Sequence, residues 1–350
     1  MVGNNTVIVI GAGASKEANL PTGVELKQRI INILNFDFDI TRLLKSGDPR
    51  VYEALRLMVR QGTPESSSMS QLIEAALRIR DALPVAMSID SFIENHKGNK
   101  AIETCGKLSI VRSILEAERK SLLFVDAGGA SRTLDLHGFK NTWFEPFLQL
   151  LTERCVAEKL KDRLSNIRLI IFNYDRCVEQ FLYHALQIYY GISPGEAGEL
   201  ICGMEIYHPY GKVGELPWYG KKDAIEFGAE PDAKDLVKLA NKIKTYTEGT
   251  NPESSDILKI REGMKDADFV IFLGYAFHIQ NLDLIYPAEG KHINAGNVCY
   301  FATAKSISSH DRGVVVKELV KRGGANRENI ILVDNTCFEL FRKHWRSLSI

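Results

Sequence analysis

The stretch VIVIGAGASKEANLPTG, residues 7–23, decides which fold we expect. Its first four residues are β-branched and apolar, and they run directly into the turn GAGAS at residues 11–15. A buried strand that ends at a glycine turn is typical of nucleotide-binding α/β proteins, because glycine lets the backbone approach a phosphate at the start of the next helix. Lys16 occupies the third glycine position of the dinucleotide-binding fingerprint. The stretch therefore predicts a nucleotide site that departs from that of a hydride-transfer enzyme.

Other apolar segments extend this prediction to a whole sheet. They lack the alternation of a half-buried strand and lie at residues 169–172, 269–273, 298–302 and 330–333. Strands that are apolar on both faces indicate a parallel sheet with helices on each side. Helical periodicity appears instead at residues 23–34, 50–60, 70–83 and 107–123.

We therefore expect an α/β fold, a Rossmann-like doubly wound parallel sheet with an inserted helical module. Residues 1–30 and 165–350 would form a discontinuous Rossmann-like domain. Residues 31–164 would form the helical insertion between its first two strands.

Composition limits the class of protein. Lys plus Arg and Asp plus Glu number 44 each, so the formal net charge is zero, and we expect no direct binding of nucleic acid by this chain. The six cysteines include no C-x-x-C pair, which predicts reduced thiols. We see neither a signal-peptide pattern nor an apolar run of roughly 20 residues, the length that spans a bilayer. The expected location is the cytoplasm, without a membrane anchor.

Several motifs together resemble the sirtuin family. The GAGAS turn is followed by LPTG at residues 20–23, and IFNYD at residues 171–175 matches the family's Asn-x-Asp. The segment FVIFLGYAFHIQNLDLI, from residue 269, has Gly274-Tyr275-Ala276 where the family has Gly-Thr-Ser, and VDNTCFEL, from residue 333, has the place of the adenine-side loop. The family's zinc-binding C-x-x-C pairs are absent, and the helical insertion takes their place.

That insertion narrows the resemblance to one branch. The segments SIDSFIENH (residues 88–96) and NTWFEPFLQLL (residues 141–151) are similar to the sirtuin-like NAD-cleaving effector domains of bacterial anti-phage defence systems. The resemblance implies an NAD+ hydrolase that releases nicotinamide and ADP-ribose, uses NAD+ as substrate, requires no metal and defends the cell by depleting NAD+.

The resemblance also implies the roles of particular residues. Asn173 would be catalytic and orient the ribose and water, while Asp175 would hold the nicotinamide amide. The residues implied in NAD+ binding are Gly11, Ala12, Gly13, Ser15, Pro21, Thr22, Asn173, Asp175, Tyr210, Gly274 and Tyr275.

The general base of the family is a histidine followed by glycine, downstream of Asn-x-Asp. His137-Gly138 precedes Asn173, so chain order argues against it. Downstream, the segment YHPYG at residues 207–211 can be aligned so that either Tyr210 or His208 takes the histidine position. We choose His208 as the catalytic base, because an imidazole with a pKa near 6.5 suits proton transfer and a phenol with a pKa near 10 does not. In an extended segment, Tyr210 would lie on the same side as His208.

Partners are implied by the resemblance alone. It suggests a homo-oligomer whose activity is controlled by a separately encoded partner, a HerA-like hexameric ATPase or, as second choice, a short Argonaute. Two other functions stay open. One is a non-catalytic subunit that binds NAD+ or ADP-ribose, and the other is a protein deacylase or ADP-ribosyl transferase.

Overall fold

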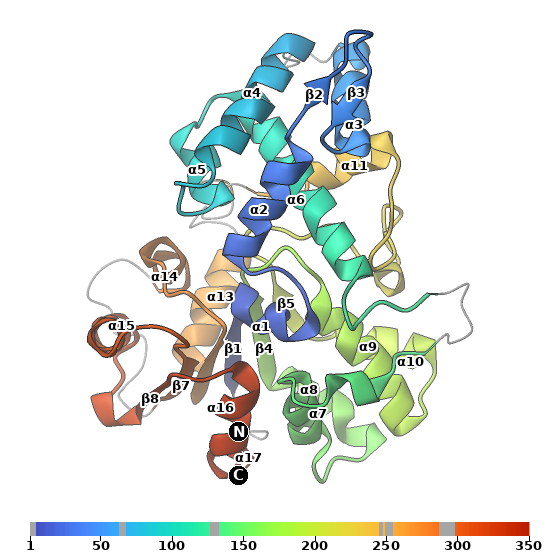
Figure 1. The fold of residues 1–350 in the computed structure, drawn as a ribbon. Coiled ribbons are helices and arrows are strands. Elements are labelled where there is room, and N and C mark those ends of the chain that lie inside the picture. Colours follow the sequence, from blue (N-terminus) through green and yellow to red (C-terminus); the bar gives the residue numbers. More distant parts are fainter. Residues whose placement is uncertain are drawn as a thin grey trace.

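A six-stranded parallel sheet forms the centre of the molecule (Figure 1). The computed structural model describes residues 5–62, 68–126, 133–244, 248, 255–286 and 298–349. The strands are β1 (Thr6–Ile10), β4 (Ile167–Ile171), β5 (Glu205–Tyr207), β6 (Phe269–Leu273), β7 (Cys299–Thr303) and β8 (Ile330–Val333). Their spatial order is β5-β4-β1-β6-β7-β8, which is the 3-2-1-4-5-6 order of Rossmann folds when the sheet strands are counted along the chain. The expected fold class and all five expected strands are confirmed.

β1 lies in the middle of the sheet, as its composition predicts. It pairs with β4 on one side and with β6 on the other, so that Val9 lies between Ile170 and Phe272. The side chains of residues 7–10 are at most 1% exposed. Burial on both faces explains why β1 shows no polar alternation.

Helices cover both faces of the sheet. One face packs against α13 (Ser255–Asp266), α14 (Ile279–Ile285) and α15 (Ser309–Gly323). The other packs against α7 (Phe144–Thr152), α8 (Leu160–Ser165), α9 (Cys177–Tyr190), α16 (Cys337–Lys343) and α17 (Trp345–Ser349), with α10 (Pro194–Cys202) against α9. The two layers make the sheet doubly wound.

A group of helices that we call the helical lobe lies above the end of the sheet where β1 passes into α1 (Ala12–Ser15), as Figure 1 shows. Its members are α2 (Gly23–Ile33), α3 (Pro49–Gln61), α4 (Met69–Ala82), α5 (Ile89–Asn95), α6 (Lys100–Arg119) and α11 (Ala233–Ala240), with a hairpin of β2 (Asp37–Phe38) and β3 (Leu44–Ser46). α11 packs on α3 and α6, although it comes from beyond the expected insertion. Conversely, α7 and α8 lie within residues 31–164 but pack against a face of the sheet and not in the lobe.

Local capping fixes the entry of the chain into this lobe. The Thr22 hydroxyl accepts a hydrogen bond from the backbone of Glu25, and the Glu25 carboxylate accepts one from the backbone of Thr22, which forms a capping box at α2. α3 begins with Asp48 as its cap and Pro49 in its first turn. The end of the stretch at residues 7–23 therefore passes directly into the lobe through the capped start of α2.

Candidate functional site

The two glycine turns after β1 and β6 contact each other directly. The Gly11 amide donates to the carbonyl of Leu273 (2.9 Å), and the Gly13 amide donates to the carbonyl of Gly274 (3.0 Å). A Cβ atom on Gly13 would lie 2.8 Å from the Gly274 Cα, and Gly274 itself has a φ of +56°. The glycines are therefore required for backbone packing between the turns. Sequence reasoning had attributed Gly11 and Gly13 to the approach of a phosphate.

The rest of the opening stretch carries structural contacts. Lys16, which replaces the fingerprint glycine, forms an ion pair with Glu25. The Thr22 hydroxyl is engaged in the α2 cap, and Pro21 beside it is buried. Asn19 adopts a left-handed conformation with a φ of 70°. The expected cofactor residues Pro21 and Thr22 thus have clear structural roles, and Ala12 and Gly13 are partly exposed at the start of α1.

Glu17 anchors the segment after β1 to α7 and α16, which cover one face of the sheet. Sequence reasoning missed this contact. Its carboxylate accepts hydrogen bonds from the backbone amides of Trp143 (2.7 Å) and Cys337 (2.8 Å). The Trp143 indole donates to the carbonyl of Ala14 (3.0 Å). Burial raises the pKa of Glu17, and these amide hydrogen bonds oppose the shift. α1 is therefore held rigidly between α7 and α16.

Asn173, Ser15 and Asp175 meet where the loops after β4 and β1 come together. The Asn173 side-chain amide donates to the Ser15 hydroxyl (2.8 Å). Asp175 accepts from the Cys177 amide (3.1 Å), and burial raises its pKa although hydrogen bonds from Cys177 and Ser15 work in the other direction. Asn173 is 7% exposed and Asp175 4%. The structure thus brings together three of the expected site residues at the carboxyl edge of the sheet. They lie beside β1, which together with β6 flanks the point where the strand order reverses and where ligands usually bind in such sheets.

The His208 ring contacts the backbone of Asn173 and so lies next to this group. Its Nδ1 is 3.2 Å from the carbonyl oxygen of Asn173, and its Nε2 is 3.0 Å from Oε1 of Glu179 on α9. Glu179 is fully buried and also accepts a hydrogen bond from Lys212 (3.2 Å). Burial favours a raised pKa for Glu179, but the charges of Lys212 and His208 prevail and hold that pKa well below its ordinary value. Sequence reasoning missed Glu179 because nothing in the sequence of a buried helix identifies its distant partner.

Tyr210 points to a different element. β5 ends at Tyr207, and residues 208–211 form a turn closed by a hydrogen bond from the Gly211 amide to the His208 carbonyl (2.9 Å). The expectation of an extended segment here was wrong. The Tyr210 hydroxyl donates to Asn281 at 2.5 Å, and its ring packs 5.8 Å from that of Phe172. His208 and Tyr210 therefore serve different contacts.

An aromatic group lies beside the Asn173 loop. The rings of Phe172 and Tyr275 are 5.2 Å apart, and Tyr275 is 4% exposed. The Tyr275 hydroxyl has no hydrogen-bond partner among the described residues. The Tyr174 hydroxyl donates to Asp90 of α5, so the helical lobe contacts the Asn-x-Asp loop directly. Burial raises the pKa of Asp90, and the charge of nearby His278 opposes this.

A fully buried ion pair fixes the other end of this loop. Arg176 and Glu118 of α6 are both 0% exposed at their side chains. The Arg176 guanidinium also donates to the carbonyl of Ile225 (2.7 Å), and Glu118 accepts from the Gly228 amide (3.0 Å). These contacts join the lobe, the loop after β4 and the chain before α11.

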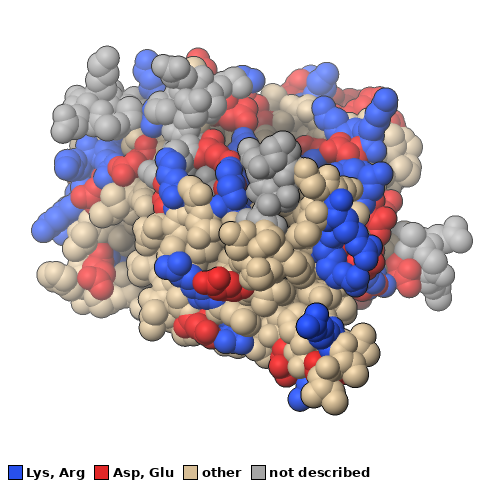
Figure 2. Space-filling view, turned by 90° about the horizontal axis from the view of Figure 1, so that it is seen from above, with Lys and Arg blue, Asp and Glu red and all other residues tan. Residues whose placement is uncertain are grey.

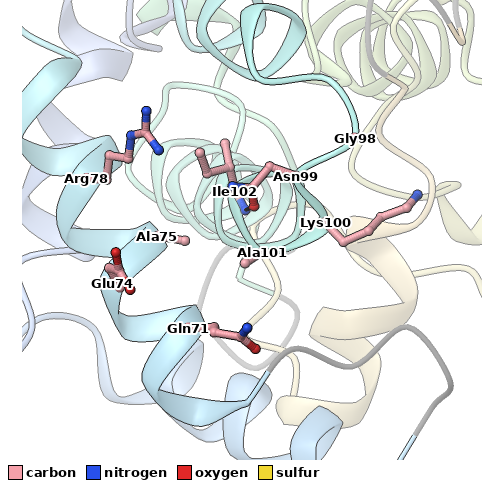
Figure 3. A pocket seen from close by; sticks show the side chains of 9 residues that line it. All are labelled: Gln71, Glu74, Ala75, Arg78, Gly98, Asn99, Lys100, Ala101 and Ile102. Atoms are coloured by element: carbon pink, nitrogen blue, oxygen red, sulfur yellow. Dashed lines mark hydrogen bonds between the residues drawn. The ribbon is translucent and has the colours of Figure 1, made fainter.

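Two pockets in the described part of the chain lie away from these residues. One, of about 420 Å³, lies between α4 and the start of α6 (Figure 3). Its lining includes Gln71, Glu74 and Arg78 on one side and Asn99 and Lys100 on the other. The second, of about 390 Å³, lies between α7 and the C-terminal helices and includes Phe338, Arg342 and Trp345. Neither contains a residue expected to bind NAD+.

The face of the molecule on the side of the helical lobe carries charges of both signs. Figure 2 shows lysine and arginine interspersed with aspartate and glutamate there. Among the described residues, no cluster of His, Cys, Asp and Glu has the arrangement of a metal site. None of the described helices combines the length and the apolar character needed to cross a membrane.

No family model matches the chain, and no curated protein matches it either.

Proposed function

We propose that this chain is an NAD+ hydrolase that produces nicotinamide and ADP-ribose, similar to the sirtuin-like effectors of anti-phage defence. The observation that supports it most directly is the hydrogen bond from Asn173 to Ser15. It joins the loops after β4 and β1 at the carboxyl edge of the sheet, next to the reversal of strand order between β1 and β6, with the Asp175 carboxyl beside it. The motif resemblance names these same residues, and the sheet geometry gives an independent reason to look for a ligand there.

The reaction explains why such groups are needed. Cleavage breaks the bond between the nicotinamide nitrogen and the ribose anomeric carbon, and the bonding electrons leave with nicotinamide. Positive charge develops on the sugar, as in glycoside hydrolysis, until water attacks and gives up a proton. Asn173 would orient the ribose and the attacking water, Asp175 would hold the nicotinamide amide, and the buried surroundings would exclude other water.

Two residues, His208 and Tyr210, are candidates for the group that accepts the proton from water. His208 is our candidate, yet both of its ring nitrogens are engaged in hydrogen bonds. Proton acceptance by His208 therefore requires release of one of them. Tyr210, the alternative, has its hydroxyl on Asn281 and the ordinary disadvantage of a phenol at neutral pH.

Asn173→Ala tests the assignment. We expect nicotinamide release from NAD+ to fall by roughly 10²–10³-fold, the usual effect of losing one preorganised polar group. Asn32→Ala is a matched control, because Asn32 is an exposed residue of α2 whose side chain accepts a hydrogen bond from Gln28, within the same helix. The assay uses chromatography of nicotinamide with the chain alone and with its co-expressed partner. Equal release by Asn173→Ala and the wild type would refute the assignment.

A non-catalytic NAD+- or ADP-ribose-binding subunit is the second candidate, and the engaged ring of His208 favours it. Calorimetry separates the two functions. Binding of ADP-ribose without any nicotinamide release, in the presence of the partner, would support the second candidate.

Control by assembly is a further part of the proposal and depends on the resemblance. An unrestrained NAD+ hydrolase would deplete its own cell, so we propose a homo-oligomer regulated by a HerA-like ATPase, with a short Argonaute as second choice. Protein deacylation or ADP-ribosylation is disfavoured because the sequence has no C-x-x-C pairs for the structural zinc of that class.

A further inference from the structure

The His208 ring is enclosed between two hydrogen-bond acceptors. Its Nδ1 faces the carbonyl oxygen of Asn173 at 3.2 Å, and its Nε2 faces Oε1 of Glu179 at 3.0 Å. The His208 side chain is 6% exposed and that of Glu179 is 0% exposed. Water is therefore largely excluded from both contacts, and the protein groups decide where the protons lie.

The chemistry of the two acceptors determines the protonation state of the His208 imidazole. A backbone carbonyl can only accept a hydrogen bond, so Nδ1 must carry a proton. An ionised carboxylate also only accepts, so Nε2 must carry one as well. A neutral imidazole has a single N–H and cannot satisfy both contacts unless Glu179 is protonated instead.

The surroundings of Glu179 favour its ionised form. Lys212 donates to the same Oε1 at 3.2 Å and is balanced by Glu215 at 3.0 Å, while Lys212 also lies 4.6 Å from the centre of the Tyr219 ring. Asp175 also interacts electrostatically with Glu179, as do the Cys177 thiol and the Tyr219 hydroxyl. Burial alone would raise the pKa of Glu179, but that pKa is lowered overall, and the charge of Lys212 is the largest effect that opposes burial. With His208 charged, the group of Glu179, His208, Lys212 and Glu215 has no net charge.

We propose that Glu179 is a positioning residue that holds His208 as an imidazolium, which in turn fixes the Asn173 carbonyl and the loop that carries the Asn173 amide. His208 is then a hydrogen-bond donor at both nitrogens in the resting protein and can act as a base only after it has lost one of these two protons. The inference rests on the proposed function in one respect only, the catalytic role of the loop that carries Asn173. The protonation state itself is independent of NAD+ cleavage.

Nitrogen NMR of the full chain with ¹⁵N-labelled histidine at pH 7.0 tests this. We expect both ring nitrogens of His208 to be protonated, whereas a histidine with a pKa near 6.5 is about three-quarters neutral at that pH. His208→Gln assigns the signals by their loss. His184 of α9 is an internal reference for the neutral form, because its Nε2 lies 3.1 Å from the Gln180 amide nitrogen and burial lowers its pKa to about 4.

Glu179→Gln keeps a hydrogen-bond acceptor of the same shape and removes its charge. In this variant we expect His208 to lose one proton and show a neutral ring at pH 7.0. Glu215→Gln is the matched control, because it removes an acid from the same group without touching His208. Should Glu179→Gln fail to fold, the wild-type spectrum still decides.

Neutral-ring signals of His208 in the wild type would overturn the inference, as would an imidazolium that persists in Glu179→Gln. Both results are read without any NAD+. A protonated, Glu179-dependent ring in a chain that releases no nicotinamide would support the inference and contradict the proposed function.

Discussion

At the scale of single residues, His184 shows how burial sets the charge state of a side chain. Burial lowers its pKa to about 4, so the folded chain binds fewer protons at this site than the unfolded chain between pH 6.5 and 4. The free energy of unfolding therefore falls as the pH falls through this window. At pH 5 the loss from this one site, relative to pH 7, should be about 2 kcal/mol.

Comparison with His184→Gln isolates this contribution from the other titrating groups. Urea unfolding at pH 7 and pH 5 should show a smaller acid-induced loss of stability in the variant than in the wild type. Identical losses in the two proteins would mean that His184 titrates normally in the folded state.

Single residues of the candidate site differed in how far the sequence could predict them. Asn173, Asp175 and Ser15 belong to recognisable motifs at strand ends, and the structure places them together. Glu179 belongs to no motif, and Asp90 in the segment at residues 88–96 was assigned no role. Their roles depend on contacts with residues far away in the chain, and such contacts follow from the packing of elements, which a single sequence does not show.

At the scale of elements, the contact between the turns after β1 and β6 is the most constrained feature. Gly274 has a φ of +56°, and a Cβ atom on it would collide with the backbone of Gly13 and Ala14. Gly274→Ala should therefore cost more than the roughly 1–2 kcal/mol of left-handed strain alone. Chemical unfolding measures this loss directly.

Gly220→Ala is the matched control, because Gly220 has a similar φ of +64° and no atom within 4 Å of a Cβ there. Its cost should be limited to the backbone strain. If both variants lost the same stability, the turn-to-turn contact would not be the reason for glycine at position 274.

The elements themselves were predicted where they are long and strongly patterned. The five apolar strands and the helices α2, α3 and α4 appear close to the expected places, and α6 covers most of its expected range but begins earlier, at Lys100. β5 was missed because it is a three-residue edge strand that begins with Glu205 and has only β4 beside it. The turn at residues 208–211 was missed because alternation was assumed to continue past this short strand.

At the scale of the whole molecule, the helical lobe lies over the carboxyl edge of the sheet (Figure 1). Two buried contacts join them, the Glu118–Arg176 ion pair and the hydrogen bond from Tyr174 to Asp90. The sequence predicted helices between β1 and β4, but it could not show that α11 joins the lobe while α7 and α8 pack under the sheet. This division depends on which helix faces match in space.

The position of the lobe leads to a prediction about ligand binding. If ADP-ribose binds at the carboxyl edge below the lobe, amide hydrogen exchange should slow both in α5 and in the loop at residues 173–176, because the ligand would hold these segments together. At a ligand concentration 100 times the Kd, exchange that requires the ligand to leave should slow by about a hundredfold, equivalent to about 2.7 kcal/mol. Residues 71–78 of α4, at the pocket beside the start of α6, are the internal control and should not change. Protection confined to that pocket would place the ligand within the helical lobe and remove the candidate site from consideration.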